Sequence, residues 1–200
     1  PLCELRGGTF LSYDIFVQGI TRNFSTTDNI IQVDGLDVWK LYVVQIAYVN
    51  SVGSGPLSAA QQFRTGEGVP SSPIDITVTA SITSAVVSFS PPNQANGIII
   101  NYDVAYSQKQ DFSESLQKPT TSQSTSLTDL SPATVYYVKV RARTNAGYGS
   151  YSNVIRTVTL DDYPGPPNQL TATGRNETCI SISWQQPNVT NGVILEYLIK

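Results

Sequence analysis

Apolar and polar side chains alternate along residues 136–144, and this alternation limits what the chain can fold into more than any other feature. One set is mainly apolar and the other mainly charged: Tyr136, Val138, Val140 and Ala142 alternate with Tyr137, Lys139, Arg141 and Arg143. A period of two is that of a β-strand, because successive side chains of a strand point to opposite faces of the sheet. We therefore expect a strand here with one buried and one solvated face.

The two ends of this strand carry turn signals. Residues 130–132 (Leu-Ser-Pro) predict a corner, and residues 145–147 (Asn-Ala-Gly) predict a turn with a residue free to take a positive φ. Leu130 stands six residues before Tyr136, which is the arrangement of a tyrosine corner. We expect the Tyr136 ring to be buried and its hydroxyl to bond to the backbone of the corner, a bond that contributes about 0.5–1.5 kcal/mol.

The same pattern occurs more than once. Leu36, Tyr42 and Gly53 return 94 residues later as Leu130, Tyr136 and Gly147, and Phe89 returns 95 residues later as Trp184. A fixed period of this length indicates tandem copies of one structural module. The sequence predicts a partial module at 1–67 that lacks its first two strands, a complete module at 69–160, and a partial module at 164–200 with only its first three strands. Gly- and Pro-rich linkers at 65–73 and 161–167 separate the modules.

The middle module shows the strand pattern most fully. Short alternating segments are centred on 76–78, 85–89, 102–106, 134–144 and 151–159, and the polar segment 111–126 is interpreted as a loop with a weak edge strand. Seven strands in about 92 residues, separated by turns, are typical of a Greek-key β-sandwich. The predicted fold class is all-β, with tandem seven-stranded sandwiches of immunoglobulin-like type.

The outer modules follow the same plan. In the first, we expect a strand at 13–17, a polar loop at 21–29, inward side chains at Ile31 and Val33, and a long strand from Tyr42. In the third, we expect strands around 170–172, 180–184 and 195–199. Because the pattern is interrupted at both ends, we interpret the sequence as a segment of a longer array.

Composition excludes several classes of function. The chain has 12 basic and 15 acidic residues and a net charge of −3, whereas a nucleic-acid partner calls for clustered positive charge. It has no His and only two Cys, so we expect neither a catalytic site, a metal site nor a cofactor. Cys3 and Cys179 are predicted to be free thiols. No apolar run reaches the length of a membrane span, so we expect no membrane contact within this segment.

Several of these motifs resemble those of fibronectin type III domains. Trp184 ends a strand and is followed by Pro187, an Asn191-Gly192 turn precedes Tyr197, and the Leu…Tyr corners complete the resemblance. The resemblance covers the chain as one full and two partial domains. Phe89 stands where the family usually has a tryptophan, which keeps an aromatic plug in the core but removes an indole N–H donor.

Residues 142–149 are similar to the end of a fibronectin domain in Eph receptors and receptor tyrosine phosphatases, and three modules favour a longer array, as in receptor phosphatases or sidekick-type adhesion molecules. The resemblance implies a non-catalytic, extracellular spacer and interaction segment of a single-pass adhesion or receptor protein, or of a secreted one. Its partner would be a protein ligand or a neighbouring cell-surface protein. An accessory array of a secreted carbohydrate-active enzyme and an intracellular scaffold array are alternatives.

Two sets of residues are candidate sites. Lys139, Arg141 and Arg143 share one face of a strand at a spacing of about 6.6–7 Å, which would suit a sulphated glycan, although such stripes are usually only solvated. Asn23, Asn176 and Asn188 begin N-glycosylation sequons. Asn, Ser and Thr are common in this chain, so only the placement of the sequons, in loops or at strand edges, is informative.

Overall fold

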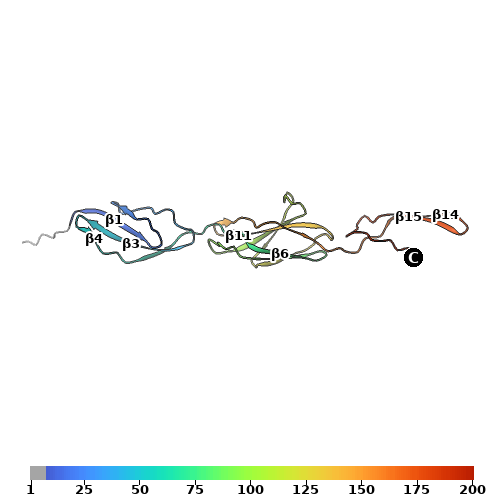
Figure 1. Cartoon of the computed structure of the whole chain (residues 1–200), viewed down its shortest axis with the longest axis horizontal. Helices are drawn as coiled ribbons and strands as arrows, with labels where there is room; N and C mark the ends of the chain where they lie inside the picture. The colour runs from blue at the N-terminus through green and yellow to red at the C-terminus, as the bar shows by residue number, and fades with distance from the viewer. Residues whose placement is uncertain (1–7) are drawn as a thin grey trace, which may run out of the picture. The chain divides into compact units, whose positions relative to one another are not determined.

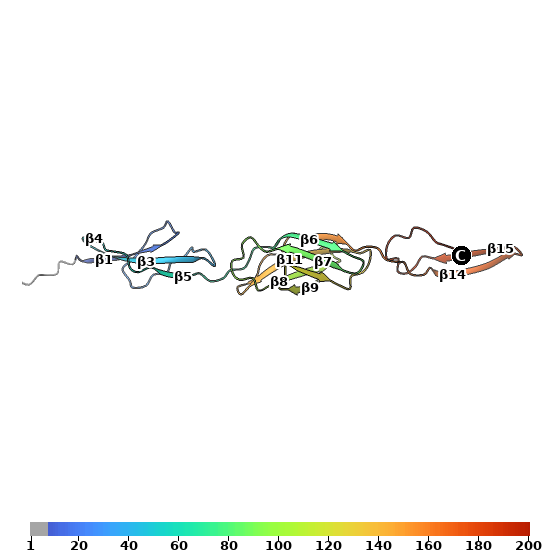
Figure 2. The ribbon, with the colours of Figure 1, turned by 90° about the horizontal axis from the view of Figure 1, so that it is seen from below.

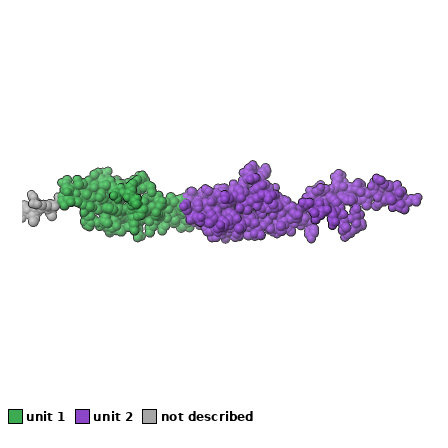
Figure 3. Space-filling model, in the orientation of Figure 1, with its two compact units in different colours: residues 1–68, 96–98 green, residues 69–95, 99–200 purple. Residues whose placement is uncertain are grey.

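Residues 8–200 are described by a computed structural model, in which every element is a β-strand. The chain forms two compact units, the first comprising residues 1–68 with 96–98 and the second residues 69–95 with 99–200 (Figure 3). The second unit contains the complete module apart from its residues 96–98, together with the segment that follows the module. The units are described separately below.

The complete module in the second unit has two antiparallel sheets (Figures 1 and 2). One sheet has the order β10-β7-β6, formed by Ser124–Leu127, Ala85–Ser90 and Ile74–Ala80. The other has the order β12-β11-β8-β9, formed by Gly147–Tyr148, Val135–Thr144, Asn101–Ser107 and Leu116–Thr120, and β13 (Ile155–Val158) also pairs with β11. This all-β, two-sheet arrangement confirms the predicted fold class.

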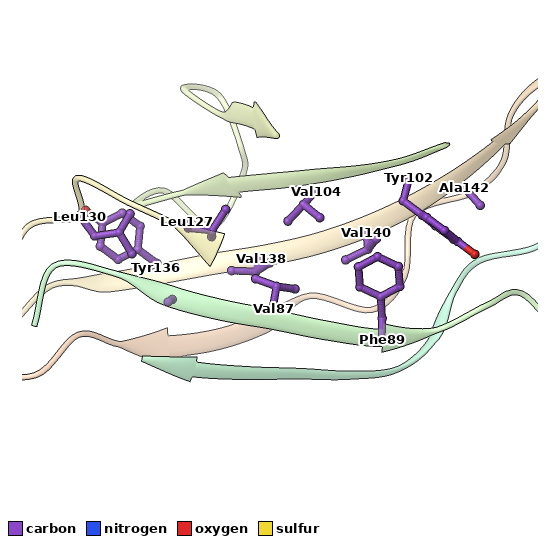
Figure 4. Close-up of a cluster of buried hydrophobic side chains, with 11 residues drawn as sticks. Val87, Phe89, Tyr102, Val104, Leu127, Leu130, Tyr136, Val138, Val140 and Ala142 are labelled. Atoms are coloured by element: carbon purple, nitrogen blue, oxygen red, sulfur yellow. The ribbon is translucent and has the colours of Figure 1, made fainter. Parts of the chain in front are cut away.

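The core of this module lies between the two sheets (Figure 4). It consists of buried side chains from β7, β8, β10 and β11 and from the corner: Ala85, Val87, Phe89, Tyr102, Val104, Leu127, Leu130, Tyr136, Val138, Val140 and Ala142. Val138, Val140 and Ala142 are 0% exposed, so the alternation that predicted β11 also predicted its buried face correctly. Phe89 packs edge-on against Tyr102 with ring centroids 4.8 Å apart, and thus fills the aromatic core position.

The polar segment 111–126 contains more regular structure than a loop with a weak edge strand. The mostly exposed strand β9 pairs with β8 at one edge, and β10 pairs with β7 in the opposite sheet. Leu127, at the end of β10, is 1% exposed. Ser- and Thr-rich segments fit a half-exposed pleated surface, so their polarity concealed these strands.

The first unit contains a single five-stranded sheet. Its strands are β1 (Phe10–Val17), β2 (Phe24–Thr26), β3 (Leu41–Asn50), β4 (Gly53–Ser54) and β5 (Gln61–Arg64). The prediction of a polar loop at 21–29 was wrong, because these residues include β2, whose Phe24 is buried against the apolar cluster of this sheet. Of the two side chains expected to point inward, Val33 does so and Ile31 does not, and no strand forms at 31–33.

The absence of a strand at residues 31–33 has a simple cause. The corresponding strand of the complete module, β10, pairs with β7, and the described part of the first unit has no equivalent of β7. Without a neighbour the backbone of Ile31 and Val33 has no ladder to join. Val33 still packs against the apolar cluster of the sheet, whereas Ile31 is 36% exposed.

The first unit also has an uncovered sheet face. Ile46 and Tyr48 on β3 stand 94 residues before Val140 and Ala142 on β11, yet they are 43% and 46% exposed, whereas the later pair is 0% exposed. In the complete module the β6–β7 layer covers this face. The difference in exposure therefore measures what the second sheet contributes to burial.

The segment after the complete module forms one hairpin, β14 (Asn168–Asn176) with β15 (Cys179–Gln185). The third strand predicted at 195–199 does not form, and Leu195 is 92% exposed. The corresponding strand of the complete module, β8, lies between β11 and β9. Neither of these two neighbours has a counterpart in residues 161–200. Trp184 contacts Tyr197, with ring centroids 5.4 Å apart. Cys179 is a free, exposed thiol, and Cys3 lies outside the described residues.

Candidate interaction face

The outer face of β11 carries a row of alternating cations and aromatic rings, which we call the cation–aromatic row. Three cations come from alternate positions of β11, one ring from the loop between β8 and β9, and two rings from β12 and the residues after it. In spatial order its members are Phe112, Lys139, Tyr151, Arg141, Tyr148 and Arg143.

Each cation of the row lies within cation–π distance of a ring. The Lys139 ammonium lies 3.8 Å from the Phe112 ring centroid and 4.4 Å from that of Tyr151. The Arg141 guanidinium carbon lies 4.6 Å from the Tyr151 ring and 3.9 Å from the Tyr148 ring. The Arg143 guanidinium carbon lies 5.0 Å from the centroid of the same Tyr148 ring. Contacts at such distances are attractive because a ring face carries negative charge.

A buried ion pair anchors the centre of the row. Asp103 on β8 stands directly opposite Arg141 in the β8–β11 register, and its Oδ2 accepts hydrogen bonds from Nη2 at 2.9 Å and Nε at 3.1 Å. The Asp103 side chain is only 4% exposed. A buried carboxylate requires such a partner, because an unpaired charge away from water is strongly unfavourable.

Burial also affects the hydroxyl of Tyr151. Loss of solvent raises the pKa of this group, Asp103 raises it further, and the positive charge of Arg141 opposes the shift. The hydroxyl is therefore neutral at physiological pH, and Tyr151 takes part in the row as an uncharged ring.

A tight turn brings Tyr148 and Tyr151 to the row. Gly147 has φ +134°, in the region that favours glycine, and Tyr148 pairs with Arg143 across the hairpin. The amide of Gly149 donates to the Ala142 carbonyl at 2.9 Å. A Cβ at Gly149 would lie 2.1 Å from the carbonyl oxygen of Pro70, so the chain at this point accepts only glycine without rearrangement.

The three predicted glycan-binding cations therefore differ in their surroundings. Lys139 and Arg141 are half-buried between rings, Arg141 is also paired with Asp103, and Arg143 is exposed. The pairing of Arg143 with Tyr148 follows from the turn and could have been predicted from the sequence. The approach of Phe112 could not, because this residue reaches the row through the path of a loop.

The corner residues lie at one end of the same module. The Tyr136 hydroxyl accepts hydrogen bonds from the Ser131 amide at 2.9 Å and from Nε2 of Gln108 at 3.2 Å. In the first unit, the Tyr42 hydroxyl accepts a hydrogen bond from the Asp37 amide at 3.0 Å. Leu130 is buried, and Leu36 packs at the edge of the first unit's apolar cluster.

The three sequon asparagines have exposed side chains. Asn23 directly precedes β2, Asn176 ends β14, and Asn188 follows β15. Oδ1 of Asn176 accepts a hydrogen bond from the Thr178 amide at 3.0 Å, and Oδ1 of Asn188 accepts one from Nδ2 of Asn168 at 2.7 Å. Each side chain is therefore open to modification.

Neither a cluster of metal ligands nor a membrane-spanning helix occurs in the described residues. Within 8–200, no group of three or more His, Cys, Asp or Glu residues is placed to hold a metal ion. The same part of the chain contains no helix that is long and apolar enough to cross a membrane.

Comparison with known families decides the nature of the complete module. Residues 70–158 match the family described as fibronectin type III domain. These residues form a fibronectin type III domain. The match spans β6 to β13, so the cation–aromatic row and the tyrosine corner both belong to this domain.

Over most or all of its length, the chain is similar to short segments of much longer proteins. It is 37% identical over 175 residues to protein sidekick-2 of Mus musculus, and the aligned residues cover 84% of this chain and 8% of that protein. It is 31% identical over 217 residues to cell adhesion molecule DSCAML1 of Mus musculus, covering 100% of this chain and 11% of the relative. Tyrosine-protein phosphatase Lar of Drosophila melanogaster is 29% identical over 163 residues, 80% of this chain and 8% of Lar. The chain thus spans about a tenth of the length of these relatives.

Proposed function

We propose that this chain is an extracellular spacer and protein-interaction segment of a cell-surface adhesion or receptor protein. The observation that carries the proposal is the similarity to sidekick-2 and DSCAML1 over 84% and 100% of the chain. The segment would supply three consecutive modules, 1–67, 69–160 and 164–200, to a single-pass membrane protein, with secretion as the alternative. Its partner would be a protein ligand or a neighbouring cell-surface protein.

The arrangement of the complete domain supports a binding role without catalysis. The cations of the row contact rings on an outer strand face, Arg141 also pairs with Asp103, and the core of the domain is apolar. A fixed, largely prearranged surface of this kind loses little side-chain entropy when a partner binds. Any enzymatic activity of the complete polypeptide would reside in another domain.

Surface staining tests the proposed location. An antibody raised against residues 69–160 should stain unpermeabilised cells that express the complete polypeptide. Staining only after permeabilisation would instead favour an intracellular scaffold. For the adhesion role, expression in non-adherent cells should cause them to aggregate, and deletion of residues 69–160 should reduce aggregation at equal surface levels. Unchanged aggregation would contradict an interaction role for this domain.

A second candidate function is binding of a sulphated glycan by Lys139, Arg141 and Arg143. The row favours it because rings hold the cations at fixed positions and Arg143 remains exposed. Arg143→Ala should lower the salt concentration at which the 200-residue chain elutes from immobilised heparin. Arg175→Ala, which removes an exposed arginine on β14 outside the domain, is the matched control. Equal elution of the two variants would contradict this candidate.

A further inference from the structure

The two linkers share a sequence feature that the proposed function does not use. An acidic residue stands three positions before a proline in both, as Glu67 before Pro70 and Asp161 before Pro164. The loop that follows the second strand of the next module contains Asn-Gly in both, at 96–97 and 191–192. The structure brings these two features together at both places.

At the first linker, within the first unit, the Glu67 carboxylate contacts the loop backbone. Its Oε1 accepts a hydrogen bond from the Ile98 amide at 3.0 Å. The next linker residue, Gly68, donates its amide to the Asn96 carbonyl at 2.7 Å. One carboxylate and one backbone bond therefore tie the linker to the Asn-Gly loop.

At the second linker, within the second unit, the corresponding groups meet again. The Asp162 amide donates to the Asn191 carbonyl at 2.9 Å, and Nδ2 of Asn191 donates to the Tyr163 carbonyl at 2.8 Å. The carboxyl group of Asp161 lies against the loop, because a Cβ at Gly192 would be only 2.7 Å from its Cγ.

A second pair of backbone bonds follows the same repeat. The Ser71 amide donates to the Gln94 carbonyl at 2.9 Å, and the Gly165 amide donates to the Val189 carbonyl at 2.9 Å. The donors are 94 residues apart and the acceptors 95 apart, which are the offsets of the modules themselves. The contact between linker and loop is thus a repeated element of the array.

The Asn-Gly pair is suited to receive the carboxylate. Asn96 and Asn191 have φ +51° and +50°, a left-handed conformation that asparagine adopts more readily than most residues. A Cβ at Gly97 would lie 3.0 Å from Cδ and Cγ of Glu67. Only a glycine leaves room for the acidic side chain to rest on the loop backbone.

We infer that the acidic residue of each linker and the Asn-Gly loop of the following module form a clamp that restricts motion of the linker. The inference rests on the proposed spacer function, because the stiffness of a spacer sets the distance that it spans. Glycine-containing linkers are otherwise flexible. A hydrogen bond to a charged acceptor is stronger than one between neutral groups. The carboxylate is also the part of the clamp that a side-chain substitution can remove without removing the backbone bonds.

Amide hydrogen exchange and ¹⁵N relaxation of the 200-residue chain test this inference. In Glu67→Ala, we expect the Ile98 amide to exchange about ten- to a hundredfold faster, as loss of a bond to a charged acceptor predicts. Gly97→Ala should give a similar increase, because its Cβ displaces the acidic side chain without removing its charge. Both variants should increase the fast internal motion of residues 65–70.

Glu177→Ala, which removes an exposed carboxylate at the β14–β15 turn, is the matched control and should change neither measurement. Unchanged exchange of the Val140 amide shows that each variant remains folded. If Ile98 exchanges at the same rate in Glu67→Ala and in the control, the clamp does not exist. If the exchange rate rises but linker motion does not, the bond exists without restricting the linker, and the inference is also wrong. Neither outcome depends on the staining or aggregation tests of the proposed function.

Discussion

The substitution Tyr136→Phe would remove one hydroxyl group from the tyrosine corner without changing the packing around the ring. Tyr136 is 6% exposed, and Phe fills the same space, so Tyr136→Phe removes only the two hydrogen bonds accepted from the Ser131 amide and Gln108. Gln108 has an exposed side chain that can turn to water, and its bond should contribute little. The free energy of unfolding therefore depends mainly on the Ser131 amide.

The surroundings of the Ser131 amide determine how much the free energy of unfolding falls in Tyr136→Phe. A cavity of about 570 Å³ adjoins the corner and is lined by Ser131, Tyr136 and Gln108 among others. Water that enters it can partly replace the lost hydroxyl, so the cost should be that of an ordinary hydrogen bond, about 1–1.5 kcal/mol, and not that of a donor buried without a partner. Tyr137→Phe, on the opposite face of β11, should cost less than about 0.5 kcal/mol.

Hydrogen exchange of β11 amides measures this cost within the intact chain. At about 1.4 kcal/mol per factor of ten, the Val138 and Val140 amides should exchange about five- to tenfold faster in Tyr136→Phe, provided that they exchange through global unfolding of the domain. In Tyr137→Phe their rates should change about twofold or less. Equal acceleration in both variants would refute the reasoning, because the two faces of the strand would then be energetically equivalent.

Two further predictions concern the same domain, and a third concerns the segments on either side of it. Gly149→Ala should destabilise it by about 1–3 kcal/mol in urea unfolding, because the new Cβ meets the Pro70 carbonyl at 2.1 Å. Gly55→Ala, its counterpart 94 residues earlier, meets its nearest atom at 3.3 Å and should cost clearly less. Arg141→Ala should destabilise the domain by about 2–4 kcal/mol in thermal unfolding, because Asp103 would remain buried without its partner. A loss similar to that of Arg143→Ala would contradict this. The three sequon asparagines should carry glycans after secretion. Intact-mass measurement before and after glycosidase treatment checks this, and an unchanged mass would show that the three sites are bare.

The alternation of residues 136–144 was sufficient to predict a strand and its buried face. A period of two is a local property, and it assigned Val138, Val140 and Ala142 to the core without knowledge of what covers them. The 94-residue recurrence of the corner and the turn was likewise enough to predict the tandem modules. The prediction of the strand succeeded because it depends on backbone geometry that a short segment carries by itself.

Other features depended on segments that meet only in the folded chain. Residues 31–33 and 195–199 have alternating apolar side chains, yet they form no strands, because the described residues 8–200 supply no neighbouring strand to complete their hydrogen bonds. The cation stripe of β11 looked solvated or free to bind a polyanion. Only the tertiary structure places Phe112 and Tyr151 against Lys139 and buries Asp103 beside Arg141. A strand needs a neighbouring strand, and a buried charge needs an oppositely charged side chain. Where that partner is distant in sequence, only the fold decides whether the two meet.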